Sequence, residues 1–375
     1  KPKRRFAGFT DDWEQRKLGD VVKNIGTGNS KFQIQEKSSD ASYAILGSTS
    51  VIGYDNNFDF EGNFVLTARV GANAGTLYQH SGKVKISDNT VYIQSDNLSF
   101  LYNLLNRFDL KKLSFGTGQP LVKSSELKKL ALNFPNKEEQ EKIGNFFNQL
   151  DYTIALHQQK QRQIRSLKQG FIKNLFPNNK NSAPRIRFSI FNDDWNQRNA
   201  SEIFTSVSDK NYPELPVLSA SQEKGMVLRE SNGIDIKYDQ KSTGTYKRVL
   251  PGQFVMHLRS FQGGFAYSTI EGITSPAYTI LAFRNKEDHY PLFWKSIFSS
   301  KNFIKRLEAI TYGIRDGRSI SYADFSTLRF WIPSYEEQKQ IGDFIESIDA
   351  TIAFYQRQID MMQSLKKELL NKMFI

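Results

Sequence analysis

Two short segments of the sequence combine glycine with arginine and a side-chain amide. They are "RVGANAG" (69–75) and "RSFQGG" (259–264), and each follows an alternating apolar run that predicts a strand. Glycine lets backbone amides approach phosphates closely, while arginine, asparagine and glutamine can make bidentate contacts to base edges. Both segments are therefore candidate nucleic-acid-binding loops. The competing interpretation is an ordinary surface turn that happens to contain an arginine.

Further polar segments occur at matching places in the two halves of the sequence. "SFGTGQPLVKSSEL" (114–127) and "TYGIRDGRSISYADF" (311–325) each precede a long predicted helix, and "AILGSTSVIG" (44–53) faces "PVLSASQEKG" (216–225). In the same weak alignment Arg69 is opposite Arg259. The candidate DNA-binding residues are Ser48, Thr49, Arg69, Asn73, Thr117, Gln119, Lys123, Ser221, Gln222, Arg259, Gln262, Arg315 and Arg318. Arg315 and Arg318 are the strongest candidates for guanine readout or phosphate contact.

Signals for catalysis are poor by comparison. The sequence has no G-x-x-x-x-G-K-[ST] nucleotide loop and no G-x-G-x-x-G after a strand, and "SPAY" (275–278) is a poor match to the motif of adenine methyltransferases. The four histidines are scattered and form no H-x-x-x-H pair for a metal. Asp109 with Glu126 and Lys128 imitates a nuclease pattern, but that pattern is too degenerate to carry an assignment. We expect no catalytic residue and no metal site in this chain.

Composition narrows the class of partner. The 375 residues include 51 Lys and Arg against 39 Asp and Glu, which gives a net charge of +12 and favours a polyanion such as nucleic acid. The absence of cysteine excludes a disulfide framework and thiolate sites. No apolar run is long enough to cross a membrane, and no apolar segment follows the basic N-terminus. We therefore expect a cytoplasmic protein without a membrane partner.

The elements that position these loops are repeated. "FTDDWEQR" (9–16) returns as "FNDDWNQR" (191–198), and the segments 135–176 and 333–374 align with each other without a gap. The chain is thus two copies of one plan, a variable globular part followed by a long helix. Trp13 and Trp195, within the repeated opening, are expected to anchor the entry strand of each copy rather than to stack on a base.

Both long segments are predicted to be helices that pair as a coiled coil. Asn136 and Ser334 are suited to cap the amides of Glu139 and Glu337, and apolar residues then recur at alternating steps of four and three. Such helices are too long to pack only on a domain of this size, so we expect them to pair with each other, and antiparallel. His157 and Gln161 are polar positions in the first seam that either fix the register or are merely tolerated there.

These features predict an α+β chain with five segments. They are a first globular domain (1–134), a first long helix (135–178), a linker (179–183), a second globular domain (184–332) and a second long helix (333–375). Each globular part is expected to mix strands with short helices. An antiparallel helix pair gives the duplicated chain a pseudo-two-fold symmetry.

The repeated motifs resemble those of a known family. "F-x-x-F-x-D-D-W-x-Q-R" opens each copy (6–16, 188–198) and "P-x-x-E-E-Q-x-x-I-G" begins each helix (135–144, 333–342). In this respect the chain resembles the specificity subunit of bacterial type I restriction–modification systems. The resemblance implies that each globular part is a target recognition domain that reads one half of a split DNA site. It also implies that the helices set the distance between the halves and dock partner subunits.

The resemblance further implies which activities lie outside this chain. Modification subunits, two per complex, would hold S-adenosylmethionine and methylate adenine, and restriction subunits would use ATP and magnesium; this chain would bind no cofactor and its own partner would be double-stranded DNA. Two alternatives remain: a coiled-coil scaffold or DNA-binding regulator without restriction–modification partners, and a fused methyltransferase or nuclease. The scaffold does not explain the charge of +12, and the fused enzyme lacks cofactor motifs.

Overall fold

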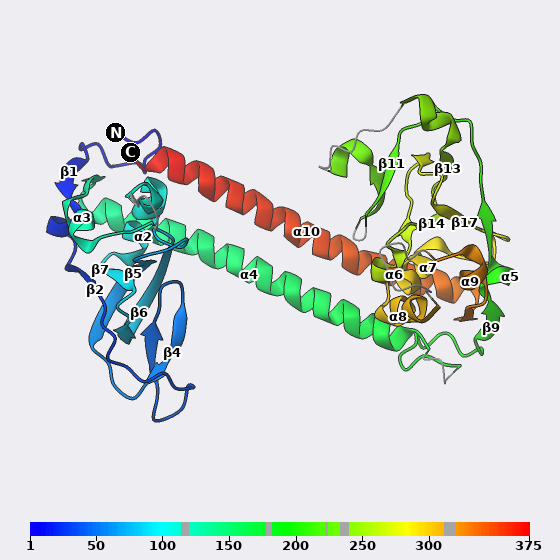
Figure 1. Ribbon diagram of the computed structural model, residues 1–375, viewed down its shortest axis with the longest axis horizontal. Helices are drawn as coiled ribbons and strands as arrows, with labels where there is room; N and C mark the ends of the chain where they lie inside the picture. The colour runs from blue at the N-terminus through cyan, green and yellow to red at the C-terminus, as the bar shows by residue number, and fades with distance from the viewer. Residues whose placement is uncertain (114–119, 178–181, 222–223, 233–239, 311–319) are drawn as a thin grey trace. The chain divides into compact units, whose positions relative to one another are not determined.

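The computed structural model describes residues 1–113, 120–177, 182–221, 224–232, 240–310 and 320–375. These residues form two compact units, the first made of Lys1–Gln159 with Gln356–Ile375 and the second of Lys160–Tyr355. The two long helices, α4 (Lys137–Leu175) and α10 (Tyr335–Met373), each contribute one segment to each unit (Figure 1). Among the described residues, no helix has the length and apolar character needed to span a membrane.

The first unit is built around a six-stranded sheet. The strand order is β2-β7-β5-β6-β3-β4, and every pairing is antiparallel except that of β3 with β6. The elements before α4 are β1 (Glu14–Lys17), α1 (Leu18–Val21), β2 (Asn24–Thr27), β3 (Tyr43–Leu46), β4 (Val51–Asp55), β5 (Phe60–Ala68), β6 (Leu77–Ile86), β7 (Thr90–Gln94), α2 (Leu98–Phe108), η1 (Leu110–Leu113), α3 (Ser124–Lys129) and β8 (Ala131–Phe134).

The second unit repeats this plan with a more broken sheet. Four strands keep the corresponding order β10-β17-β14-β15, while β11-β12 and β13-β16 form separate pairs. Its elements are β9 (Asn196–Asn199), α5 (Ala200–Ile203), β10 (Phe204–Val207), β11 (Leu218–Ser221), β12 (Gly225–Leu228), η2 (Arg229–Asn232), η3 (Gln240–Thr245), β13 (Lys247–Val249), β14 (Phe254–Met256), α6 (Ser260–Gly263), β15 (Ala266–Tyr267), β16 (Gly272–Thr274), β17 (Thr279–Phe283), α7 (Pro291–Phe298), α8 (Lys301–Ile310), α9 (Tyr322–Ser326) and β18 (Arg329–Ile332).

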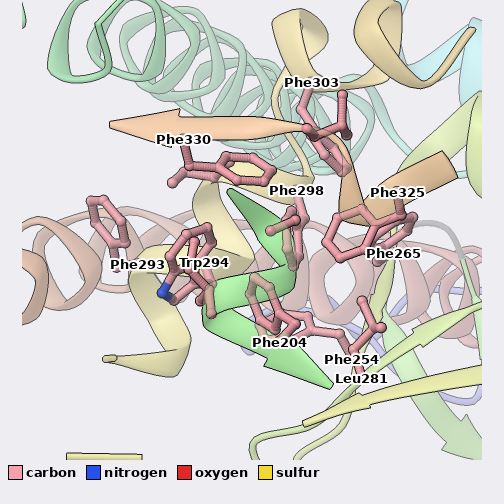
Figure 2. Close-up of a cluster of buried hydrophobic side chains, with 14 of the residues drawn as sticks. Phe204, Phe254, Phe265, Leu281, Phe293, Trp294, Phe298, Phe303, Phe325 and Phe330 are labelled. Carbon is pink, nitrogen blue, oxygen red and sulfur yellow. The ribbon is translucent and has the colours of Figure 1, made fainter. Parts of the chain in front are cut away.

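Hydrophobic clusters cover both faces of each sheet, because alternate residues of a strand point to opposite sides. In the second unit, Phe254 joins a large aromatic cluster with Phe204, Trp294 and Phe298, whereas its neighbour Val255 belongs to a separate cluster (Figure 2). The first unit has the same division into two clusters. Such cores hold the strand ends, and hence the loops, in fixed positions.

In both units the strand of the repeated opening pairs with the strand that directly precedes the long helix. β1 pairs with β8, the strand directly before α4, and β9 pairs in the same way with β18, directly before α10. Trp13 and Trp195 are only 7% and 3% exposed, so the expectation that they anchor the entry strands is confirmed.

The predicted helix starts are also confirmed. The backbone amide of Glu139 donates to Asn136 Oδ1 (2.9 Å), and that of Glu337 donates to Ser334 Oγ (3.3 Å). The two glutamate carboxylates do not reach back to the cap residue. Each instead accepts two hydrogen bonds from the arginine directly before the repeated opening, Arg5 for Glu139 and Arg187 for Glu337, at 2.6–2.7 Å.

The glycine of the repeated "I-G" lets the helix lie close to its own globular part. A Cβ on Gly144 would lie 2.9 Å from Asn97 Oδ1 and 3.1 Å from the amide nitrogen of Phe100, at the start of α2. A Cβ on Gly342 would lie 2.7 Å from the amide nitrogen of Phe293 in α7. Each long helix is therefore packed backbone-to-backbone against the helix that follows the sheet.

In the first unit the α4 and α10 segments run antiparallel, as expected. Lys366 Nζ lies 2.6 Å from an oxygen of Asp151, and the ring of Phe374 lies 5.8 Å from that of Phe147. Later residues of α10 therefore lie beside earlier residues of α4.

The second unit shows the same direction of pairing. Lys168 Nζ lies 2.5 Å from an oxygen of Asp349, and the buried Gln161 donates from Nε2 to the carbonyl of Ile352 (3.3 Å). The two lysines that interrupt the apolar seams, Lys168 and Lys366, thus each meet an aspartate. A register role for His157 and Gln161 stays a prediction.

Candidate nucleic-acid interface

Four separate segments of the first unit meet at one end of its sheet. Ser48 Oγ, in the β3–β4 turn, donates to the carbonyl of Asn89 (3.2 Å), and the backbone amide of Arg69 donates to that same carbonyl (2.8 Å). The carbonyl of Arg69 accepts from the amide of Val122 (2.8 Å), which fixes the segment leading to Lys123. The structure therefore brings together the described candidates of the first half, Ser48, Thr49, Arg69, Asn73 and Lys123, which were separated in the sequence.

The loop between β5 and β6 is held in place by hydrogen bonds to neighbouring segments and within itself. The amide of Gly75 donates to Thr67 Oγ1 (2.9 Å), the amide of Gly71 to the carbonyl of Pro120 (3.0 Å), and the amide of Ala74 to the carbonyl of Gly71 (2.9 Å). Gly75 has a φ of +85°, and a Cβ there would lie 2.6 Å from the amide nitrogen of Lys111. A loop fixed in this way loses little conformational entropy on binding a ligand.

The side chains that this end of the sheet exposes can read bases. Thr49, Arg69, Asn73 and Lys123 are exposed, and Ser48 is half-buried. Arginine and asparagine match the acceptor and donor patterns of guanine and adenine in the major groove, and a hydroxyl can bond to several bases. Asn89 was missed from the sequence, although Asp88-Asn89 between two strand-like runs is a turn signal.

The second unit presents a corresponding loop on α6. The amide of His257 donates to Ser260 Oγ (2.8 Å), the amide of Arg259 donates to His257 Nδ1 (3.2 Å), and the amide of Gln262 donates to the carbonyl of Arg259 (2.9 Å). Gly264 has a φ of +82°, and a Cβ there would lie 2.0 Å from the carbonyl oxygen of Phe298. Arg259 and Gln262 are exposed at the surface of this fixed loop.

His257 is held neutral at the base of the α6 loop. Burial lowers its pKa, and the charge of the nearby Arg259 lowers it further. A neutral imidazole is what the geometry requires, because Nδ1 accepts the hydrogen bond from the Arg259 amide. His257 therefore positions the arginine.

The strand register corrects the alignment of Arg69 with Arg259. Val65 pairs with Ile93 across β5 and β7, and both side chains lie in the cluster below α2. The corresponding pair in the second unit is Phe254 with Leu281, in the cluster below α7. This correspondence matches Gly75 with Gly264 and Asn73 with Gln262, but it places Arg259 opposite Val70 and Leu258 opposite Arg69. The sequence alignment was wrong by one residue because the short match at Gly62 and Gly252 dominated it.

The remaining candidates are placed less closely, or not at all. Ser221 ends β11, and its Oγ accepts from the amide of Lys224 (3.2 Å). The same hairpin lies against β15, since a Cβ on Gly225 would be 2.3 Å from the carbonyl oxygen of Tyr267, but no hydrogen bond among the described residues joins Ser221 to Arg259 or Gln262. Thr117, Gln119, Gln222, Arg315 and Arg318 lie outside the described residues.

The nuclease-like set has local structural roles. Asp109 caps the end of α2, where its Oδ1 accepts from the amide of Lys111 (3.3 Å), and Glu126 lies 3.6 Å from Lys123 Nζ. Across the described ranges, no three His, Asp or Glu side chains gather so that they could hold a metal ion.

Fold and site together define a duplicated α+β protein whose sheets carry polar, arginine-containing loops and whose long helices pair antiparallel. Residues 10–166 match the model of the type I restriction modification DNA specificity domain. The chain is 23% identical over 398 residues to the type I restriction enzyme MjaVIII specificity subunit of Methanocaldococcus jannaschii, covering 96% of this chain and 92% of that protein. Over its whole length the chain is thus similar to type I restriction–modification specificity subunits.

Solved structures agree with this assignment at the level of the fold. The type I restriction–modification S subunit from M. genitalium matches with a TM-score of 0.66 at 16% identity, over 100% of this chain and 99% of that one. A chain from a structure on complex assembly and conformational transition of the type I R-M system matches with a TM-score of 0.52 at 14% identity, over 98% of both chains. These likenesses show that the chain has the fold of the M. genitalium S subunit over its whole length.

Proposed function

We propose that each unit reads one half of a split DNA site with the loops at the end of its sheet. In the first unit the reading residues are Ser48, Thr49, Arg69, Asn73 and Lys123. In the second unit they are Ser221, Arg259 and Gln262. Sequence-based candidates add Thr117 and Gln119 in the first half and Gln222, Arg315 and Arg318 in the second. The single observation that carries this proposal is the meeting of three chain segments around the Asn89 carbonyl, which exposes an arginine, an amide and hydroxyls on fixed backbone.

The same proposal assigns the chemistry to other chains. The complex would act in the cytoplasm and contain two modification subunits, which hold S-adenosylmethionine, and restriction subunits, which use ATP and magnesium. The net charge of +12 supports double-stranded DNA as the direct partner of this chain. We expect no cofactor on the chain itself.

Methylome sequencing of a host that expresses this chain with its modification partner tests the division of labour. Arg69→Ala should relax or abolish one half of the methylated motif, because loss of a base contact costs about 1–3 kcal/mol. Arg259→Ala should affect only the other half. Arg16→Ala, an exposed arginine on β1 outside these loops, is the matched control and should leave the motif unchanged. Equal changes in both halves would contradict the proposal.

A further inference from the structure

Each of the two fixed loops exposes an aliphatic side chain directly beside its arginine. Val70 is 40% exposed next to Arg69, and Leu258 is 55% exposed next to Arg259. Single exposed apolar residues are common on protein surfaces and need no explanation by themselves. Their position is what distinguishes these two, because both lie on backbone that the rest of the unit holds in place.

The backbone of Val70 is fixed on both sides. Val70 forms an isolated antiparallel bridge with Leu121, and the flanking residues are held by the bonds from Arg69 to Asn89 and from Gly71 to Pro120. Its side chain therefore points outward at a defined place beside the arginine. Leu258 has a comparable support, since the amides of both neighbours, His257 and Arg259, are hydrogen-bonded within the loop.

The two loops offer the same three chemistries at matched positions. Asn73 corresponds to Gln262. Earlier in each loop, one arginine and one aliphatic residue are adjacent, in the order Arg69-Val70 in the first unit and Leu258-Arg259 in the second. In the major groove, arginine suits guanine and a carboxamide suits adenine, while an aliphatic group suits the 5-methyl group of thymine. The other base edges of the major groove are polar, so the thymine methyl group is the one partner there that matches an aliphatic side chain.

We propose that Val70 and Leu258 each contact the 5-methyl group of a thymine in the half-site that their unit reads. This inference rests on the proposed function and adds to it a specific reading contact for thymine. Because the arginine and the aliphatic residue exchange places between the loops, the two units would apply the same contacts in a different order, which suits two different half-sites.

Replacing single thymines by deoxyuridine tests the contact, since it removes only the methyl group. The duplexes carry the motif found for the wild-type chain by methylome sequencing, and binding is measured with the complete complex of this chain and its modification partner. At one position of one half-site, deoxyuridine should weaken binding about fourfold, the value expected for one methyl group removed from water. In the Val70→Ala complex the same replacement should have no further effect. Leu258→Ala should do the same in the other half.

Controls separate this contact from general effects. Val51→Ala and Leu228→Ala remove exposed aliphatic side chains outside the two loops, at 37% and 43% exposure, and should keep the full sensitivity to deoxyuridine. A half-site without thymine, a flat deoxyuridine scan with the wild-type complex, or unchanged sensitivity in Val70→Ala would each overturn the inference while leaving sequence-specific binding intact. Absence of sequence-specific binding by the wild-type complex would instead overturn the proposed function itself.

Discussion

In the first unit β5 runs unbroken for nine residues, whereas the corresponding stretch of the second unit is divided into β13 and β14. The break falls at Pro251 and Gly252, where proline offers no amide and glycine has a φ of +87°. Two hydrogen bonds still join the residues of the break to Ser268, which directly follows β15. The Gly252 amide donates to the Ser268 carbonyl (2.8 Å), and the Ser268 amide donates to the Gln253 carbonyl (2.9 Å). The sheet can therefore vary locally without losing its strand order.

The contacts between each globular part and its long helix, by contrast, are the same in both units. The arginine–glutamate pairs Arg5–Glu139 and Arg187–Glu337 have the same bidentate geometry, and Gly144 and Gly342 make the same close approach. The comparison teaches that the chain keeps one frame for holding helices and varies the sheet and loops built on it. That division suits the proposed function, in which the two units read different half-sites.

The two units also differ in how the opening meets a helix end. In the second unit the amide of Ile186 donates to the carbonyl of Asn174 at the end of α4, from which the chain continues into that opening. In the first unit the amide of Arg4 donates to the carbonyl of Lys372 at the end of α10, a contact between residues far apart in the sequence (Figure 1). The same backbone contact therefore joins residues close in the sequence in the second unit and the two ends of the chain in the first.

The largest effect that we expect follows from this equivalence. Residues 1–183 carry both Asp151 and Lys168, the two kinds of group that pair in each unit of the whole chain. Expressed alone, this half should form a two-fold dimer in which the end of α4 from one copy replaces α10 in the other. Light scattering in solution should give twice the mass of the half-chain.

A charge exchange sharpens this test. Asp151→Lys should dissociate the half-chain dimer, because it places like charges together in the seam, and adding Lys168→Asp should restore it with reversed polarity. A folded monomer, or a dimer that ignores both changes, would mean that the equivalence of the two helix ends does not govern assembly.

Much of the frame could be predicted from the sequence, because it depends on short-range rules. Caps at Asn136 and Ser334 and the spacing of apolar residues are local signals, and the structure confirms both helices. Antiparallel pairing was also expected, although a direct signal was overlooked. The start of each long helix is acidic and its end basic, so an antiparallel arrangement sets Asp151 beside Lys366 and Asp349 beside Lys168.

The arrangement of the candidate site was less accessible to sequence reasoning. The Asn89 carbonyl joins Ser48 to Arg69 through tertiary hydrogen bonds, which no local pattern encodes. The displaced match of Arg69 with Arg259 has a similar cause. A one-residue shift moves a strand's side chains to the opposite face, and only the pairing of Val65 and Phe254 with their neighbours reveals which face is correct.

The second prediction concerns the repeated ion pair at the helix starts. Glu139 and Glu337 have side chains that are 0% and 1% exposed, so removal of the arginine leaves a buried carboxylate without its partner. Arg5→Ala should destabilise the first unit by about 3–5 kcal/mol, and Arg187→Ala the second unit by a similar amount. Hydrogen exchange followed by mass spectrometry, resolved by unit, measures both. The exposed Arg16→Ala is the control, and equal loosening of both units by either variant would contradict their independence.

The smallest expected effect is a sensitivity of the second unit to acid. Burial against Phe283 and Trp294 lowers the pKa of His289 to about 4, the charge of Arg198 also lowers it, and Asp288 opposes both. The folded protein keeps this imidazole neutral, while the unfolded chain takes up a proton below its ordinary pKa of about 6.5. Stability is therefore complete above that pH and falls by about 1.4 kcal/mol per pH unit as the pH drops toward 4. Between pH 7 and pH 5 the second unit should lose about 2 kcal/mol.

Urea unfolding followed by tryptophan fluorescence measures this effect, because Trp195, Trp294 and Trp331 belong to the second unit and only Trp13 to the first. His289→Phe removes the titrating group and keeps an aromatic ring against Phe283, so its unfolding free energy should change little over the same pH range. If the wild-type protein and His289→Phe lose stability in parallel between pH 7 and pH 5, other groups govern the acid response. The difference between the two units would then rest on their sheets and loops alone.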